Sequence, residues 1–285
     1  MNERKDKILA LLSLSNLSLV NQRKILEELN SLLSECTQDL YEFGIKFENA
    51  NLFEKLLFQI IFHNSSLSNL TKGSSINIRN KNIKINDMTA IYSLARLQIE
   101  TFVNLSYIFF LDSEHSKNIR AYVYKIQGLR KQIFLTKKHR KDFEPISKMR
   151  NELAQELKNL RKLQEYKEAT FSTKEKYINP KYARLMKPDD VFKLIQIGKL
   201  SRTHSLYSNH IHSEYISIRQ LNSALKKGKE SEASFSTVLT LCSRITALAI
   251  ANLNSQYELE RGAYSKAPNR LIKLIESLNE LSAKL

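Results

Sequence analysis

The stretch MTAIYSLARLQIETFVNLSYIFFL, residues 88–111, is the most apolar helix-like segment of this 285-residue chain. Its apolar residues recur at helical spacing, which predicts a helix that is largely buried in a core. Asn86 or Asp87 stands at its start, where a side-chain oxygen can accept the free amide hydrogens of the first turn. This helix should therefore lie at the centre of the fold.

The same helical periodicity continues outward from this segment to both ends of the chain, and alternating strand patterns are scarce. Only 6 glycines and 4 prolines break the chain. We therefore expect an all-α fold, a multi-helix bundle in which the highly charged residues 145–169 could project as a helical hairpin arm. Further helices are expected over about residues 4–36, 51–70, 116–135, 189–197, 201–225, 235–257 and 268–284.

Two segments break the helical pattern. Residues 71–86 are polar and are expected to form a loop with a short extended piece at 76–85, and residues 171–188 are expected to be an irregular connection. The preferred partition of the chain is an N-terminal helical extension, residues 1–80, followed by a main helical bundle domain, residues 81–285.

Cysteine usage and hydropathy favour a cytoplasmic protein. Cys36 and Cys242 lie in apolar helical patterns without metal-ligand spacing, as expected of free buried thiols in a reducing compartment. No uninterrupted apolar run reaches the roughly eighteen residues that cross a bilayer. We therefore expect no membrane partner.

Arg96 and Glu100 are the strongest candidate site residues because they are ionisable residues inside the apolar stretch. Their i,i+4 spacing places them on one face of the helix, where they can pair. Burying an unpaired charge is costly, and a buried pair gains little over apolar residues. The pair is therefore either a structural lock in the core or part of a site in which Arg96 binds an anionic group.

Ser208 and His212 form a second i,i+4 pair about a hundred residues later. His212 could act as a general base near neutral pH, with Ser208 orienting it or a substrate. His204, His212, Glu214 and Glu100 could in principle hold a metal, but no H-E-x-x-H pattern sets their spacing, so no metal site is expected. No cofactor is expected either, because neither GxxxxGK[ST] nor GxGxxG occurs.

The chain carries a formal net charge of +16, which would attract nucleic acid or another polyanion. Eleven Lys and Arg residues lie between Lys117 and Arg150, and a solvated helical face would explain them equally well. Tyr122 and Phe134 are interleaved with these cations, and for both rings the core is the favoured place. The candidate nucleic-acid-binding residues are Arg130, Lys131, Lys137, Lys138, Arg140 and Lys141.

The strings ARLQIETFVNLSYIFF, RAYVYK at 120–125 and LYSNHIHSE resemble a bacterial all-helical family of unknown function with Arg-x-x-x-Glu and Ser-x-x-x-His segments. The resemblance covers roughly residues 85–255, and the family is loosely similar to HEPN-type helical bundles, many of which are ribonuclease toxins or parts of antiviral defence systems. It implies functional roles for Arg96, Glu100, Ser208 and His212.

One departure from the HEPN pattern is clear. HEPN ribonucleases typically have an Arg, then four to six intervening residues, then a His, whereas Ser205, Leu206 and Tyr207 occupy the corresponding places before His212. A ribonuclease would therefore need a composite site from two helices, with Arg96 supplying the positive charge.

Two functions follow, and the residues leave open whether the protein is an enzyme. The first is a metal-independent effector of a bacterial defence or toxin system that acts on RNA through Arg96, Glu100, Ser208 and His212. The second is a non-catalytic module that binds nucleic acid or an acidic protein through the basic segment. Either could work as a homo-oligomer or within a defence complex.

Overall fold

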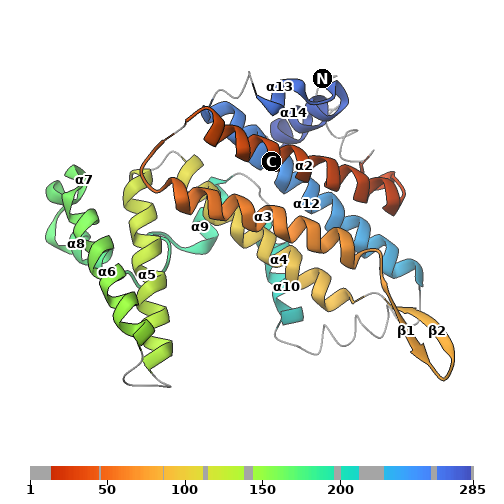
Figure 1. Ribbon diagram of the computed structural model, residues 1–285, viewed down its shortest axis with the longest axis horizontal. Coiled ribbons are helices and arrows are strands. Elements are labelled where there is room, and N and C mark those ends of the chain that lie inside the picture. Colours follow the sequence, from red (N-terminus) through yellow and green to blue (C-terminus); the bar gives the residue numbers. More distant parts are fainter. Residues whose placement is uncertain are drawn as a thin grey trace. The chain divides into compact units, whose positions relative to one another are not determined.

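The computed structural model describes residues 14–44, 46–85, 87–111, 115–137, 144–195, 200–211, 228–257 and 262–283. The fold is all-α, as the sequence predicts, with one short β-hairpin among the described residues (Figure 1). The chain divides into two compact units. Unit 1 comprises residues 1–46, 53–105 and 196–285, and unit 2 comprises residues 47–52 and 106–195.

Unit 1 is built around the long apolar helix α12, which packs against α2, α4 and α14 (Figure 1). By length and composition α12 could also cross a membrane, but most of its apolar stretch is buried within the bundle, which accounts for its composition. The described elements of this unit are α2 (Leu19–Glu42), α3 (Ala50–Leu70), β1 (Ser74–Ile78), β2 (Lys81–Ile85), α4 (Met88–Leu105), α10 (Leu200–Ile211), α12 (Gly228–Tyr257), α13 (Ala263–Lys266) and α14 (Asn269–Ala283).

A chain of buried polar side chains joins four helices of this unit. Asn64 of α3 donates to Asn30 of α2 at 3.0 Å and to Thr246 of α12 at 2.8 Å, and it accepts a hydrogen bond from Gln98 of α4 at 2.8 Å. Because an unsatisfied buried amide is costly, this network fixes the register of the four helices against one another.

The central helix begins as expected and ends differently. Asp87 caps α4, with its Oδ1 atom accepting a hydrogen bond from the Ala90 amide at 2.9 Å. The α-helix ends at Leu105, and the chain continues as a π-helical turn, η1 (Ser106–Phe110), that closes with a bond from the Leu111 amide to the Ser106 carbonyl at 2.7 Å. The helix expected over 88–111 is therefore two helical types in succession.

Unit 2 contains η1 and the helices α5 (Lys117–Lys137), α6 (Glu144–Lys162), α7 (Gln164–Glu168), α8 (Phe171–Ile178) and α9 (Pro188–Leu194). Helices α5 and α6 pack against each other. The segment 145–169, expected as a projecting arm, supplies α6 and α7 of this unit. Its core includes Ile119, Tyr122, Val123 and Ile126 of α5 with Leu160 of α6 and Tyr177 of α8.

Several expected boundaries need correction. The irregular connection expected at 171–188 contains α8, capped by Thr170. The helix expected over 145–169 breaks at Leu163 into α6 and α7. The partition expected at residue 80 falls inside unit 1, since residues 53–105 belong to one compact unit.

Candidate functional site

Glu100 binds two basic side chains through one carboxylate oxygen. Its Oε1 atom lies 2.8 Å from an Nη atom of Arg96, one turn earlier on α4, and 2.9 Å from Nε2 of His204 on α10. Arg96 and Glu100 therefore pair as their i,i+4 spacing predicts. The third member of the cluster comes from 104 residues farther along the chain.

The packing of α10 on α4 brings these groups together. Tyr92, Arg96 and Glu100 follow one face of α4 at four-residue spacing, and the ring of Tyr92 stacks on Tyr207 of α10, with centroids 4.9 Å apart and planes 25° apart. Tyr207 is buried, and its burial raises the pKa of its hydroxyl group. The stacked pair thus anchors α10 beside the face of α4 that carries the cluster.

The cluster is neither fully buried nor fully exposed. The side chains of Arg96, Glu100 and His204 keep 20%, 35% and 22% of their surface accessible to solvent. A small charged substrate group could therefore reach them, while the surrounding protein lowers the screening of their charges. In such a place a carboxylate can fix the orientation of an imidazole, and a guanidinium can stabilise negative charge on a phosphate.

Ser208 lies one turn beyond His204 on α10 and is half-buried, so helical spacing places it on the same face of that helix as His204. His212 lies outside the described residues, and its proposed role stays a prediction. Sequence reasoning considered His204 only as a metal ligand and missed it as a partner of Glu100. Its four-residue spacing from Ser208 was the available signal.

The basic segment only partly forms a cationic surface. Lys131 is exposed on α5 and Arg130 is half-buried there, whereas Arg120 is buried. Of the remaining candidates, Lys137 ends α5 and its side chain is not described, and Lys138, Arg140 and Lys141 lie outside the described residues. Exposed cations on α6 extend the basic surface, namely Lys148, Arg150, Lys158, Arg161 and Lys162.

The two aromatic predictions for this segment had opposite outcomes. Tyr122 is buried, as predicted, and its hydroxyl group donates to the carboxylate of Glu48. Phe134 is 69% exposed, so its expected place in the core is wrong. Ile126, Leu129 and Ile133 form the buried stripe of α5, and a residue directly after Ile133 turns about 100° away from that stripe.

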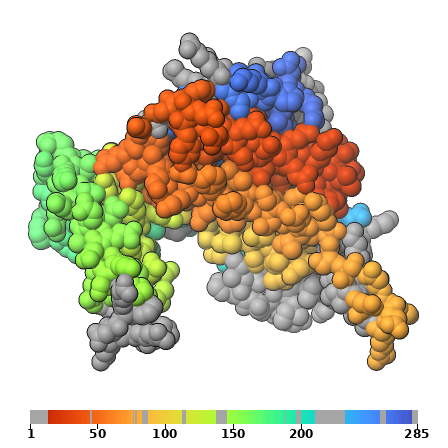
Figure 2. Space-filling view, viewed as in Figure 1, coloured from red at the N-terminus to blue at the C-terminus, as the bar shows by residue number. Residues whose placement is uncertain are grey.

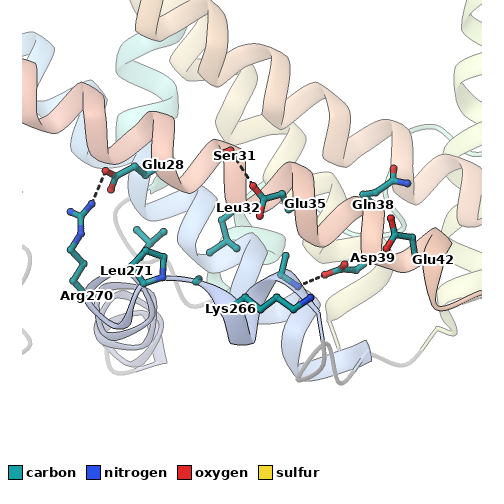
Figure 3. A pocket seen from close by; sticks show the side chains of 13 residues that line it. Glu28, Ser31, Leu32, Glu35, Gln38, Asp39, Glu42, Lys266, Arg270 and Leu271 are labelled. Atoms are coloured by element: carbon teal, nitrogen blue, oxygen red, sulfur yellow. Dashed lines mark hydrogen bonds and ion pairs between the residues drawn. The ribbon is translucent and has the colours of Figure 1, made fainter.

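A groove of about 520 Å³ lies between α2 and the α13–α14 segment (Figure 3). Two contacts join the sides of this groove. Arg270 of α14 pairs with Glu28 of α2 at 2.6 Å, and Asp39 of α2 accepts a hydrogen bond from the Ala263 amide of α13 at 2.6 Å. A Cβ at residue 262 would lie 2.2 Å from Oδ2 of Asp39, so any residue other than glycine there would displace this carboxylate. These contacts dock α13 and α14 onto α2, and they depend on tertiary packing that sequence spacing does not reveal.

Both cysteines are buried, as predicted. Burial raises the pKa of Cys36 and of Cys242 to about 12, which keeps both thiols protonated and unreactive near neutral pH. In the part of the chain that the structure describes, no group of three or more His, Cys, Asp or Glu side chains is placed to hold a metal ion.

No protein-family model matches the chain, no curated protein matches its sequence, and no solved structure matches its fold. The resemblance to HEPN-type bundles therefore stays a prediction that rests on short motifs.

Proposed function

We propose that this protein cleaves RNA without a metal ion, as an effector of a bacterial defence or toxin system, and that Arg96, Glu100 and His204 form its reaction centre. The observation that supports the proposal is the single Glu100 oxygen bound by Arg96 at 2.8 Å and by His204 at 2.9 Å. A pair suffices to neutralise a carboxylate in a core. A second ionisable partner of Glu100, at a partly exposed position, favours chemistry over stability alone.

The proposed reaction is attack of a ribose 2′-hydroxyl on the neighbouring phosphate. The bond from the 2′-oxygen to phosphorus forms, the bond from phosphorus to the 5′-oxygen breaks, and the products are a 2′,3′-cyclic phosphate and a 5′-hydroxyl. A base takes the proton from the 2′-hydroxyl and an acid donates one to the leaving oxygen, so no redox partner is needed. His204 would take the proton from the 2′-hydroxyl and then give it to the leaving 5′-oxygen, Glu100 would orient the imidazole, and Arg96 would stabilise the phosphate charge.

The test is cleavage of end-labelled RNA by the purified protein with chelator present. We expect His204→Gln and Glu100→Gln to lower the rate by about 10²–10⁴-fold, the usual contribution of acid–base catalysis. His115→Gln is a matched control, because His115 also lies near a carboxylate, 3.7 Å from Glu165, but within unit 2. Helical content by circular dichroism should stay the same in all variants.

The results of these assays test the proposed function and distinguish His204 from His212 as the catalytic base. If the wild-type protein leaves RNA intact when chelator is present, the proposed metal-independent cleavage is wrong, whether or not added divalent cations restore it. If His212→Gln abolishes cleavage while His204→Gln does not, His204 is a structural partner of Glu100 and the base is the histidine predicted from the sequence.

A second candidate function is binding without catalysis, and the charge of unit 2 favours it. This unit carries 21 Lys and Arg against 12 Asp and Glu, although it is much the smaller of the two. Polyanion binding of this kind weakens steeply with salt. Salt-dependent RNA binding that persists in Glu100→Gln, without cleavage by the wild-type protein, would support this function over the first.

A further inference from the structure

The β1–β2 hairpin carries positive charge that nothing nearby in the sequence offsets. Between Glu54 and Asp87 the chain has no Asp or Glu, whereas it has Lys55, Lys72, Arg79, Lys81 and Lys84. Lys72 is paired with Glu27 of α2 at 3.7 Å, and the remaining cations of this stretch give this part of unit 1 a local positive field.

The hairpin has short strands and a two-residue turn. Its two five-residue strands pair antiparallel, from Ser74 opposite Ile85 to Ile78 opposite Lys81, and only Arg79 and Asn80 form the turn. Both turn residues have positive φ values, 49° and 63°, where glycine or asparagine is usual. A left-handed conformation at an arginine costs on the order of 1 kcal/mol, so the tip holds a cation at a position that glycine would occupy more cheaply.

The tip is exposed to solvent. Figure 2 shows the hairpin standing out from the surface of unit 1, and the structure leaves Asn77, Arg79, Asn80, Lys81 and Asn82 exposed. Among the described residues no ion pair neutralises Arg79 or Lys81. The tip therefore presents two cations and three side-chain amides to solvent, without an acidic group.

The shape and composition of the tip favour a duplex over a single strand. The segment from 72 to 87 has no aromatic residue, so it offers no ring on which an unpaired base could stack. Two strands about 4.8 Å apart fit the roughly 12 Å width of the major groove of B-form DNA. The narrow major groove of A-form RNA does not admit them.

We infer that the β1–β2 hairpin binds duplex DNA by entering the major groove, with Arg79 and Lys81 contacting phosphates or base edges and the asparagines hydrogen-bonding within the groove. This interaction goes beyond the proposed RNA cleavage, because it uses a different surface and a different nucleic acid. It would let one protein hold DNA while its other surfaces act on a second molecule.

The test is fluorescence anisotropy of the full chain with a labelled DNA duplex, an RNA duplex of the same sequence and a single-stranded RNA. We expect the DNA duplex to bind best. Arg79→Glu combined with Lys81→Glu should weaken that binding at least tenfold and lower the slope of log affinity against log salt by about 2, since each lost phosphate contact lowers it by about 1.

Lys24→Glu combined with Lys273→Glu is the matched control, since it makes the same charge change at exposed positions of unit 1 outside the hairpin and the stretch around it. Its affinity should fall less than threefold. Equal losses of DNA affinity in both double variants would show that binding depends only on the overall positive charge. Binding of the RNA duplex as tightly as the DNA duplex would contradict entry into the major groove. Either result overturns the inference. The His204→Gln variant should bind DNA normally, so failure of the RNA proposal leaves this test intact.

Discussion

Glu100 is the residue on which the proposed chemistry depends, because its carboxylate binds a guanidinium and an imidazole at once. The charge of that carboxylate and its shape make separable contributions. Glutamine keeps the shape and an acceptor oxygen but removes the charge, so Glu100→Gln preserves the packing of α10 on α4 better than alanine would. Loss of cleavage in that variant with unchanged helical content would therefore point to electrostatics rather than to packing.

His63, on α3, should make the stability of the protein depend on pH. Its Nδ1 atom is buried without a hydrogen-bond partner among the described residues, and burial lowers the pKa of its side chain, an effect that the amide of Gln98 partly opposes. In the unfolded chain histidine titrates near its ordinary pKa of about 6.5. Below that pH the side chain of His63 is protonated in the unfolded chain but remains neutral in the folded chain. The free energy of unfolding is therefore highest above about pH 6.5 and falls as the pH decreases toward the lowered pKa.

Urea unfolding at about pH 7.5 and 5.5 checks this prediction. The wild-type protein should lose more stability than His63→Gln over this interval, by no more than about 1.4 kcal/mol per pH unit, the limit for one proton. All other titrating groups are the same in both proteins. Equal pH dependence in the two would show that His63 is protonated as readily in the folded state as in the unfolded one.

At the scale of elements, Arg120 holds the π-helical turn η1 in place. The side chain is only 2% exposed, and it donates to the Ile108 carbonyl from Nε at 3.3 Å and from Nη2 at 3.1 Å, and to the Leu111 carbonyl at 2.8 Å. Its guanidinium also lies 5.6 Å from the centre of the Tyr107 ring. The last carbonyl groups of a helix lack intrahelical partners, and this buried cation supplies donors for two of them, one in η1 and one directly after it.

Arg120→Met should therefore destabilise unit 2 by about 3 kcal/mol, since hydrogen bonds from a charged group are worth roughly 1.5–3 kcal/mol each and are only partly additive. Arg120→Lys keeps the charge but cannot reach both carbonyls in one plane, so its loss should be intermediate. Chemical denaturation measures both. Lys131→Met, at an exposed position of the same helix, should change stability by less than about 0.5 kcal/mol, and a similar loss there would contradict the role given to Arg120.

Helices with a sustained apolar stripe could be predicted from the sequence. Features whose conformation depends on tertiary contacts could not. The expected helices at 51–70, 116–135 and 268–284 match α3, α5 and α14 within a few residues, because no glycine or proline interrupts their core-facing stripes except Gly128. The π-turn after Leu105 escaped prediction, and the Ile108 carbonyl within it is satisfied by Arg120, which lies in another helix. His204 was missed as a site residue for the same reason, since its distance from Glu100 is set by the packing of α10.

At the scale of the whole molecule, unit 2 is inserted into unit 1 along the chain. Unit 1 gathers residues 1–46, 53–105 and 196–285, and its polar network links α2, α3 and α4 to α12 from the last of these segments. The core of unit 1 therefore cannot be completed until most of the chain is available. Unit 2 is formed mainly by the continuous segment 106–195, so its contacts join residues that are closer in the sequence.

Because each unit has its own core, variants in one should not loosen the other. A smaller unit buries a smaller fraction of its surface, so α5 and α6 should exchange their amide hydrogens before α12 does in hydrogen-exchange mass spectrometry.

Arg120→Met should speed exchange only in unit 2. Asn64→Leu, which is nearly isosteric but leaves the amide of Gln98 without its 2.8 Å acceptor, should speed exchange only in unit 1, by roughly tenfold for each 1.4 kcal/mol lost. Uniform acceleration across the chain in both variants would mean that the two cores unfold together, and the proposed reaction centre on α4 and α10 would then depend on the stability of α5 and α6 as much as on its own unit.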